Sequence, residues 1–247
     1  MATDDVEVAR RAARAAAEVL LALRSAGELT GRALGDGGDA AAQRAIVEVL
    51  AADRPADVVF SEEAVDDARR LAADRVWIVD PLDGTREYGE PGRHDWAVHV
   101  ALWSAGELTA AAVALPGLSE ILVTDPAPVL PARAEGPVRI AVSRSRPPAE
   151  ASAVAAALGA ELVPLGSAGY KTVAVARGEV DAYVHSGGQY QWDSAAPVAI
   201  ARAAGLTTCR LDGSPLVYND PDPWLPDLIV CRPELADRIL DAVKAPA

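Results

Sequence analysis

Two aspartates stand three residues apart at the end of an apolar segment, in the stretch WIVDPLDGTREY that spans Trp77 to Tyr88. Other acids also stand at the ends of apolar segments: Glu62 and Glu63 end VVFSEE, and Asp193 lies in QYQWDSAAP. Like charges held close together repel each other, so a cluster of these carboxylates needs a positive partner. Mg²⁺ usually takes a few carboxylates, keeps waters and adds substrate phosphate oxygens. The pattern therefore indicates a magnesium site that binds a phosphorylated molecule.

Each acid also has a purely structural explanation. Asp39 and Asp193 stand where helices are expected to begin, and an N-cap role would explain both. Asp80 precedes a proline, as in an ordinary turn, and Asp83 precedes a glycine, as in a hairpin turn. Glu62 and Glu63 could be a solvent-exposed pair of charges before a loop. The joint pattern of acids is harder to explain in this way than its separate parts.

The pair Gly84 and Thr85 directly follows the second aspartate. If a short helix begins here, its free backbone N–H groups point at an anion, and the helix dipole favours negative charge. One loop would then face metal with its acids and phosphate with its amides, and the Thr85 hydroxyl would be placed to orient a water.

The elements before this loop and around it read as helices followed by strands. Apolar residues from Val6 to Leu23 recur every three or four positions and predict an amphipathic helix. LGDGGD breaks that pattern, and a second helix is predicted from Asp39 to about Ala52. Five strand-like runs follow, which predict an antiparallel meander: DVVFSE, RVWIVDP, DWAVHVALW, LTAAAVALP and EILVTD.

The Pro-rich stretch 126–137 is a plausible boundary between two halves of the chain. After it, the sequence pattern predicts alternating strands and helices. Strands are predicted at VRIAVS, ELVPL, VDAYVH and DLIVC, with helices between and after them. We expect an α/β protein in two halves, residues 1–130 with most of the acids and residues 137–247 with Asp193, which together form one compact unit.

Composition excludes several classes of function. The net charge of −13 argues against binding a nucleic-acid polymer, which requires a basic face. No apolar run reaches the roughly 18 residues of a membrane span, and the N-terminal stretch lacks the features of a signal peptide. Cys209 and Cys231 form no CxxC pair, so we expect reduced thiols and a cytoplasmic protein. His99 alternates with apolar residues, and we interpret it as a buried histidine whose hydrogen bonds are satisfied.

The motifs SEE, DPLDGT and WDSAAP, in this order, resemble those of the Mg²⁺-dependent, lithium-sensitive phosphatases that include inositol monophosphatase and fructose-1,6-bisphosphatase. The resemblance extends over nearly the whole chain and implies the layered α/β/α/β/α sandwich of that family. It also implies two or three Mg²⁺ ions and in-line attack of a metal-activated water on phosphorus. The family often dimerises, so the resemblance allows a homodimer and leaves the oligomeric state open.

The resemblance assigns roles residue by residue. The implied metal ligands are Glu62, Asp80, the backbone carbonyl of Leu82, Asp83 and Asp193, with Glu63 as a supporting or weaker ligand. Gly84 and Thr85 are implied to bind phosphate through their backbone N–H groups. Asp39 and Thr85 are implied to orient the attacking water, and Glu62 is counted with them as catalytic. LGDGGD lacks the threonine that often precedes the upstream aspartate, so Asp39 matches the family pattern least well.

The tail of the loop motif bears on the substrate. DGTREY, with an acid followed by an aromatic, resembles the CysQ-type branch, which removes the 3′-phosphate of 3′-phosphoadenosine 5′-phosphate. RIAVSRSR, PLGSAGYK and GGQYQWD resemble that branch in its actinobacterial form. Alternatives are an inositol-1-phosphate, fructose-1,6-bisphosphate or other sugar or nucleoside phosphatase, or a catalytically silent phosphate sensor. Six residues at strand ends or helix starts are predicted to contact the substrate: Ser143, Arg144, Ser145, Ser167, Lys171 and Tyr190. Arg144 and Lys171 are expected to meet a second phosphate, and Tyr190 to stack on a base.

Overall fold

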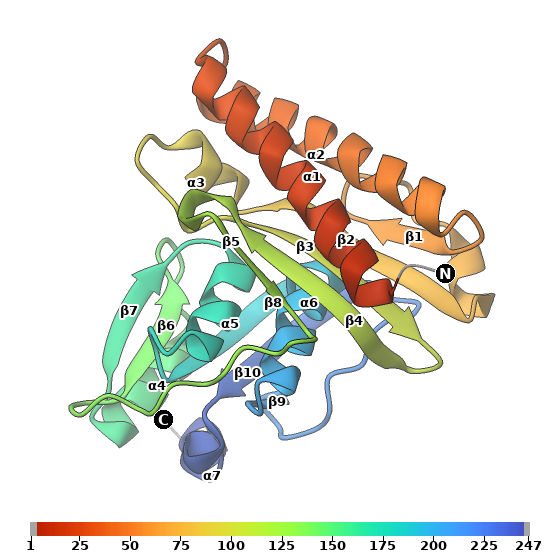
Figure 1. Ribbon diagram of the computed structural model, residues 1–247. Helices are drawn as coiled ribbons and strands as arrows, with labels where there is room; N and C mark the ends of the chain where they lie inside the picture. Colours follow the sequence, from red (N-terminus) through yellow and green to blue (C-terminus); the bar gives the residue numbers. More distant parts are fainter. Residues whose placement is uncertain (1–3, 245–247) are drawn as a thin grey trace.

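The computed structural model of the protein describes residues 4–244, which fold into five layers (Figure 1). Two long helices cover one face of a five-stranded sheet, and two further helices separate that sheet from a second one. A last pair of helices covers the outer face of the second sheet. The predicted α/β/α/β/α arrangement is therefore confirmed.

The outer helical layer consists of α1 (Asp5–Ala26) and α2 (Gly31–Asp53), which pack along each other. The chain turns between them at Gly27, whose φ of 70° is left-handed. The prediction that LGDGGD ends the helical pattern was wrong, because these residues lie inside α2. The glycines serve packing instead: a Cβ at Gly35 would lie 2.5 Å from the side chain of Thr85, and one at Gly38 would lie 2.8 Å from the ring of Tyr88.

The first sheet has the strand order β1-β2-β3-β4-β5. Its strands are β1 (Val58–Ser61), β2 (Arg75–Asp83), β3 (Ala97–Ser104), β4 (Glu107–Leu115) and β5 (Glu120–Val123). The predicted antiparallel meander holds from β2 to β5, but β1 pairs with β2 in parallel. The connection from β1 to β2 crosses over through the 3₁₀ turn η1 (Ala68–Ala72), and a second such turn, η2 (Pro116–Leu118), joins β4 to β5. The carboxyl ends of β1 and β2 consequently lie at the same edge.

The second sheet follows a connection, residues 126–137, that has no helix or strand. It has the order β7-β6-β8-β10-β9 and consists of β6 (Arg139–Ser143), β7 (Glu161–Leu165), β8 (Ala182–Tyr190), β9 (Thr207–Cys209) and β10 (Trp224–Cys231). Strand β6 is parallel to β7 and β8, whereas β10 is antiparallel to β8 and β9. The sequence pattern did not predict β9, which is only three residues long.

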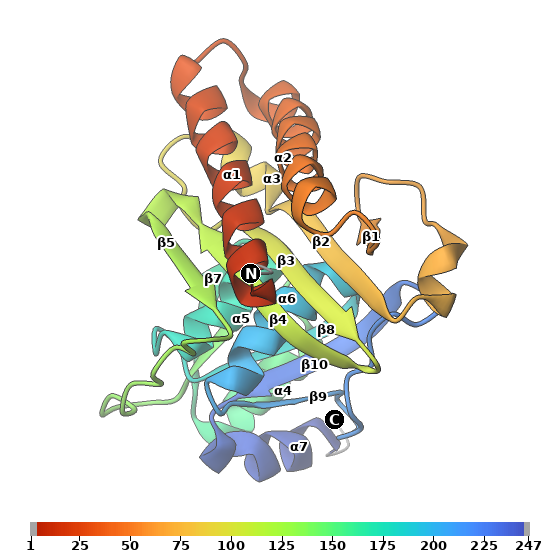
Figure 2. The same cartoon turned by 45° about the vertical axis from the view of Figure 1, so that its right-hand side comes forward.

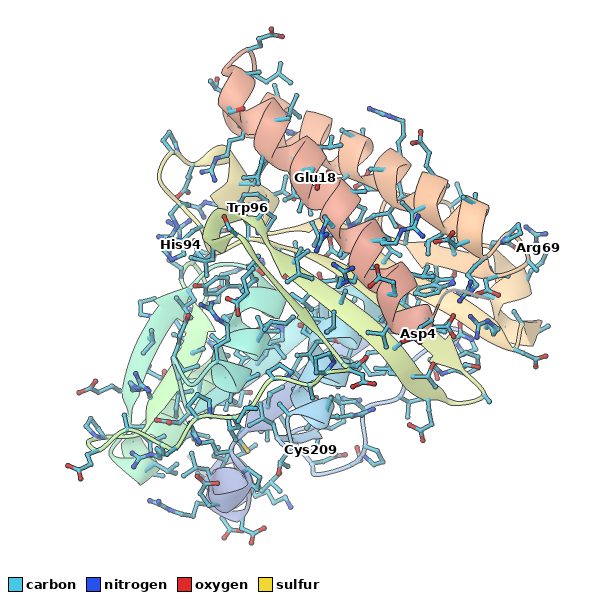
Figure 3. All side chains as sticks on the ribbon, in the orientation of Figure 1. Asp4, Glu18, Arg69, His94, Trp96 and Cys209 are labelled. Carbon is cyan, nitrogen blue, oxygen red and sulfur yellow. The ribbon has the colours of Figure 1, made fainter. Side chains whose placement is uncertain are left out.

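The helices of the second half occupy two layers. Between the sheets lie α5 (Ala168–Ala176) and α6 (Gln191–Ala203), and their apolar residues share one core with the inner face of the first sheet. On the outer face lie α4 (Ala149–Leu158) and, after the turn η3 (Pro233–Leu235), α7 (Ala236–Lys244), far from α1 and α2 (Figure 2). The buried free thiol of Cys209 belongs to this outer cluster (Figure 3). No helix among residues 4–244 is long and apolar enough to cross a membrane.

Candidate active site

The DPLDGT loop begins as the last part of β2 and ends in the short helix α3 (Thr85–Gly89), which was expected after Gly84. Gly84 has a left-handed φ of 88°, and a Cβ there would lie 3.1 Å from the Cβ of Ser167. Only glycine fits this turn without strain. The Thr85 hydroxyl donates a hydrogen bond to the carbonyl of Leu82 at 3.2 Å, which ties the start of α3 to the loop.

Asp80 is buried in this loop, and only one of its two carboxylate oxygens accepts a hydrogen bond. Its Oδ1 accepts a hydrogen bond from the backbone N–H of Leu82 at 3.0 Å. Its Oδ2 has no hydrogen-bond partner within the described chain. Burial, and then the negative charges of Asp83, Glu62 and Asp193, raise the pKa of Asp80 well above its ordinary value. The described chain therefore supplies no cation to compensate the ionised form of Asp80.

Asp83 reaches from the first half of the chain to the start of α5 in the second half. Its Oδ2 accepts hydrogen bonds from the Ser167 hydroxyl at 2.5 Å and from the N–H of Gly169 at 2.6 Å. Its Oδ1 accepts one from the N–H of Ala168 at 3.2 Å. The positive end of a helix favours such a carboxylate, so Asp83 also holds the acidic loop against the N-terminus of α5.

Glu62 and Asp193 approach the same place from β1 and α6. The backbone N–H of Glu62 donates to the carbonyl of Val79 at 3.4 Å, beside the end of β2. Although Glu62 keeps contact with solvent, partial burial and then the charges of Asp83 and Glu63 raise its pKa to about 7. Burial, and then Asp83, raise the pKa of Asp193 to about 8. The structure thus gathers acids from three separate sequence motifs.

Neither Asp39 nor Asp193 is an N-cap, which was the structural alternative for both residues. Asp193 lies in the first turn of α6, where its Oδ2 accepts a hydrogen bond from the N–H of the actual N-cap, Tyr190, at 2.6 Å. Asp39 lies in the middle of α2 because that helix begins earlier than predicted. Burial, and then Glu63 and Glu62, raise the pKa of Asp39 to about 7, so its carboxyl faces the same acidic cluster.

His99 is a site residue whose role the sequence pattern missed. It is fully buried on β3, opposite Asp80 in the strand pairing, and its Nε2 lies 3.4 Å from Oδ2 of Asp83. Its Nδ1 lies 3.2 Å from the carbonyl of Trp192, but Nε2 has no hydrogen-bond partner within residues 4–244. The prediction of a fully satisfied histidine was therefore wrong. The available signal was its register: a histidine facing inward on the strand next to DPLDGT.

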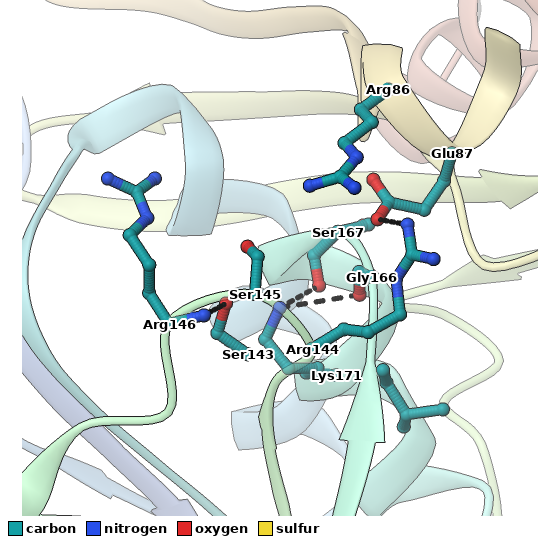
Figure 4. Close-up of a pocket in the computed structure, with 10 residues that line it drawn as sticks. Arg86, Glu87, Ser143, Arg144, Ser145, Arg146, Gly166, Ser167 and Lys171 are labelled. Atoms are coloured by element: carbon teal, nitrogen blue, oxygen red, sulfur yellow. Dashed lines mark hydrogen bonds and ion pairs between the residues drawn. The ribbon is translucent and has the colours of Figure 1, made fainter. Parts of the chain in front are cut away.

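A polar cavity of about 480 Å³ lies beside the acids (Figure 4). Five of the six predicted substrate contacts line it, namely Ser143, Arg144, Ser145, Ser167 and Lys171. Arg86 and Arg146, which were not predicted, line it as well. Tyr190 does not: its half-exposed ring stacks on Trp192, with ring centroids 4.8 Å apart.

Two of the cations in this cavity already have strong partners. Arg144 donates to Glu87 at 2.8 Å and to Glu90 at 2.9 Å. Lys171 is buried, and its Nζ donates to the carbonyl of Ser167 at 2.5 Å. Burial lowers the pKa of Lys171 from its ordinary value. The two cations expected to meet a second phosphate are thus committed to other groups.

The donor set of the acidic cluster fits a divalent cation. Asp80, Asp83 and His99 offer ligand atoms that lie within 4.8 Å of one another, and all three residues are buried. The orphaned Oδ2 of Asp80 faces this group without a partner in the described chain. Carboxylate oxygens of this kind are the ligands that Mg²⁺ prefers.

Comparison with known proteins gives matches along nearly the entire chain. The model of the inositol monophosphatase family matches residues 2–245. A 3′-phosphoadenosine 5′-phosphate phosphatase of Mycobacterium tuberculosis is 51% identical over 218 residues, which are 85% of this chain and 82% of that relative. The enzyme of the same name from Mycobacterium leprae is 47% identical over 253 residues, 97% of this chain and 93% of its own. Among solved structures, CysQ from Bacteroides thetaiotaomicron has a TM-score of 0.80 at 27% identity, covering 92% of this chain and 97% of that one.

Proposed function

The chain belongs to the inositol monophosphatase family, and we propose that it removes the 3′-phosphate of 3′-phosphoadenosine 5′-phosphate to give AMP and phosphate. The observation that carries the proposal is the gathering of Glu62, Asp80, Asp83 and Asp193 at one edge, in a chain that is 47% identical to a phosphatase of this name over 97% of its length. A silent phosphate sensor would have no physical reason to hold repelling acids together.

The acids are proposed to hold two or three Mg²⁺ ions. The ligands would be Glu62, Asp80, Asp83, Asp193 and the carbonyl of Leu82. When bound, Mg²⁺ supplies the positive charge that compensates the carboxylates and polarises the phosphoryl group. Glu63, which follows Glu62 and is exposed, would support the site from its rim.

The remaining groups of the loop act on the water and the phosphate. Since the Thr85 hydroxyl donates to Leu82, its oxygen is left to accept a hydrogen bond from the attacking water. Asp39 faces the cluster from α2 and is proposed to hold the same water. The backbone N–H groups of Gly84 and Thr85, at the start of α3, are proposed to bind the phosphate. A small phosphorylated substrate, a homodimer and a cytoplasmic location complete the proposal.

A phosphate-release assay tests this function. The purified protein is incubated with Mg²⁺ and, separately, 3′-phosphoadenosine 5′-phosphate, inositol 1-phosphate and fructose 1,6-bisphosphate. We expect the largest kcat/KM for the bisphosphonucleotide. A tenfold preference for inositol phosphate would refute the substrate, and no release from any of them would refute the enzyme.

A further inference from the structure

Arg70 is a buried arginine that the proposed reaction does not use. It lies on η1, between β1 and β2, and its side chain is 1% exposed. Its guanidinium donates two hydrogen bonds to Asp66, at 2.6 and 3.0 Å, and lies 4.1 Å from the centroid of the Phe60 ring. A buried charge is tolerated when it is paired and hydrogen-bonded. Because Phe60 and Asp66 flank Glu62 in the sequence, Arg70 holds the segment that contains this acid on both sides.

The other donors of Arg70 reach a loop of the second half, residues 219–223. Its Nη1 donates to Oδ1 of Asn219 at 3.0 Å and to the carbonyl of Asp220 at 2.9 Å, and its Nη2 donates to the carbonyl of Pro221 at 3.3 Å. Asn219 returns a hydrogen bond from its Nδ2 to the carbonyl of Arg70 at 3.0 Å. The two segments, 149 residues apart in the sequence, therefore lie side by side (Figure 2).

Gln191 binds the same loop to the start of α6, two residues before Asp193. Its buried side chain donates from Nε2 to the carbonyl of Asp222 at 2.7 Å and accepts at Oε1 from the N–H of Asp220 at 3.3 Å. Its backbone N–H donates to the carbonyl of Pro223 at 2.9 Å. The position of the loop therefore determines where α6 begins and where Asp193 lies.

We propose that Arg70 is a positioning residue for the metal site, which sets the distance between Glu62 of the first half and Asp193 of the second. This inference rests on the proposed function, in which both acids bind Mg²⁺. Arg70 acts through the two segments that its guanidinium joins. The neighbouring rings of Phe60 and Trp192 also meet edge to face across the two halves, with centroids 5.2 Å apart. Five donors in a rigid, planar group suit a role in which geometry matters.

The sign of the change in metal affinity distinguishes this role from two others. Removing a positive charge favours a cation bound nearby, so a purely electrostatic role predicts tighter metal binding when Arg70 is neutralised. A purely structural role predicts a lower melting temperature with an unchanged dissociation constant. A positioning role predicts weaker binding, because the acids no longer keep the spacing that the ions require.

The test measures Mn²⁺ binding to the full chain, by electron paramagnetic resonance of the free ion at a temperature where circular dichroism shows each variant folded. Arg70→Met should raise the dissociation constant about tenfold or more, as for other partners of metal ligands. Arg70→Lys keeps the charge without the planar fork and should also bind more weakly than wild type. Asn219→Gly tolerates the left-handed φ of 59°, removes two bonds to Arg70 and should weaken binding less. It decides the matter if Arg70→Met does not fold.

Arg232→Met is the matched control, because Arg232 is also buried, 3% exposed, but its guanidinium binds Asp181 beside the second sheet. It should lower the melting temperature and leave the dissociation constant close to wild type. Ser119→Gly is the control for Asn219→Gly, since Ser119 has a left-handed φ of 56° at the turn η2. Equal constants for the variants and their controls, or tighter binding by Arg70→Met, would overturn the inference alone. A wild type that binds no Mn²⁺ would instead refute the metal site of the proposed function, and the inference with it.

Discussion

Asp80 and Asp181 are equally buried, each 1% exposed, yet the chain treats their charges in opposite ways. Asp181 lies beside the second sheet, where its Oδ1 accepts a hydrogen bond from the buried Arg232 at 3.2 Å. Its Oδ2 accepts one from the N–H of Arg139 at 2.9 Å. Asp80 has an oxygen without any hydrogen-bond partner among residues 4–244, and the neighbouring charges that shift its pKa are all acids.

The contrast shows that the chain provides a positive partner for one buried carboxylate and none for the other. A buried carboxylate is tolerated when it is paired and hydrogen-bonded, as Asp181 is. At Asp80 the nearest available base is His99, whose pKa burial lowers, so it supplies no positive charge near neutral pH. A proton or a cation from outside the chain must then compensate Asp80, and the acids gathered around it are the physical argument for a bound cation.

The largest expected effect is on the rate of phosphate release, which should fall at Asp80 and not at Asp181. Asp83→Asn and Asp80→Asn should each reduce phosphate release about a thousandfold or more, because a bound metal contributes several kcal/mol to catalysis. Asp181→Asn should leave kcat per folded molecule close to wild type. The rates are measured with saturating Mg²⁺ and corrected for the folded fraction. Near-normal turnover of either site variant would contradict the ligand set.

The free energy of unfolding should distinguish the same two aspartates in the opposite order, with the larger loss at Asp181. Asp181→Asn leaves the buried Arg232 without its carboxylate and should lower the free energy of unfolding by about 3 kcal/mol. Asp80→Asn removes a repelled charge and should leave the metal-free protein as stable as wild type or more so. Urea denaturation with a chelator present measures both. Equal destabilisation by the two variants would remove the contrast.

His99 is expected to position Asp83 and the Trp192–Asp193 segment, which its two ring nitrogens face. His99→Phe keeps the bulk and loses both polar contacts, and Mg²⁺ affinity should fall roughly 10- to 100-fold, as for other partners of metal ligands. His99→Gln should recover part of that affinity. The readout is the Mg²⁺ concentration that half-saturates thermal stabilisation, because a purely packing role would lower Tm without shifting this midpoint.

The smallest effect is the pH dependence of the metal-free protein. The folded pKa values of about 7 for Asp39 and Glu62, and about 8 for Asp193, lie above their ordinary values. The native state thus holds more protons than the unfolded chain, so stability falls as pH rises. The loss should begin above about pH 4 and continue through about pH 8. Melting temperatures with a chelator should decrease across this range, and saturating Mg²⁺ should flatten or reverse the trend. A rise with pH in the chelated protein would refute the account.

Local patterns predicted the parts of the site that one segment determines. DPLDGT contains its own strand end and helix start, and both were predicted correctly. The start of α2 was not, because Gly35 and Gly38 are explained by α3, about fifty residues later. The role of His99 depends on strand register, and the roles of Arg144 and Lys171 depend on which other groups they already contact. Such information exists only once the two halves are packed together.

The most direct test of the cation at Asp80 is anomalous diffraction from a crystal of this protein soaked in Mn²⁺ as a substitute for Mg²⁺. We predict strong peaks within coordination distance of the carboxylates of Asp80, Asp83 and Asp193, with Glu62 at the edge of the site. Asp181 should show no peak, because Arg232 already compensates it. Density without an ion at the acidic cluster would contradict the account, whatever activity the protein shows.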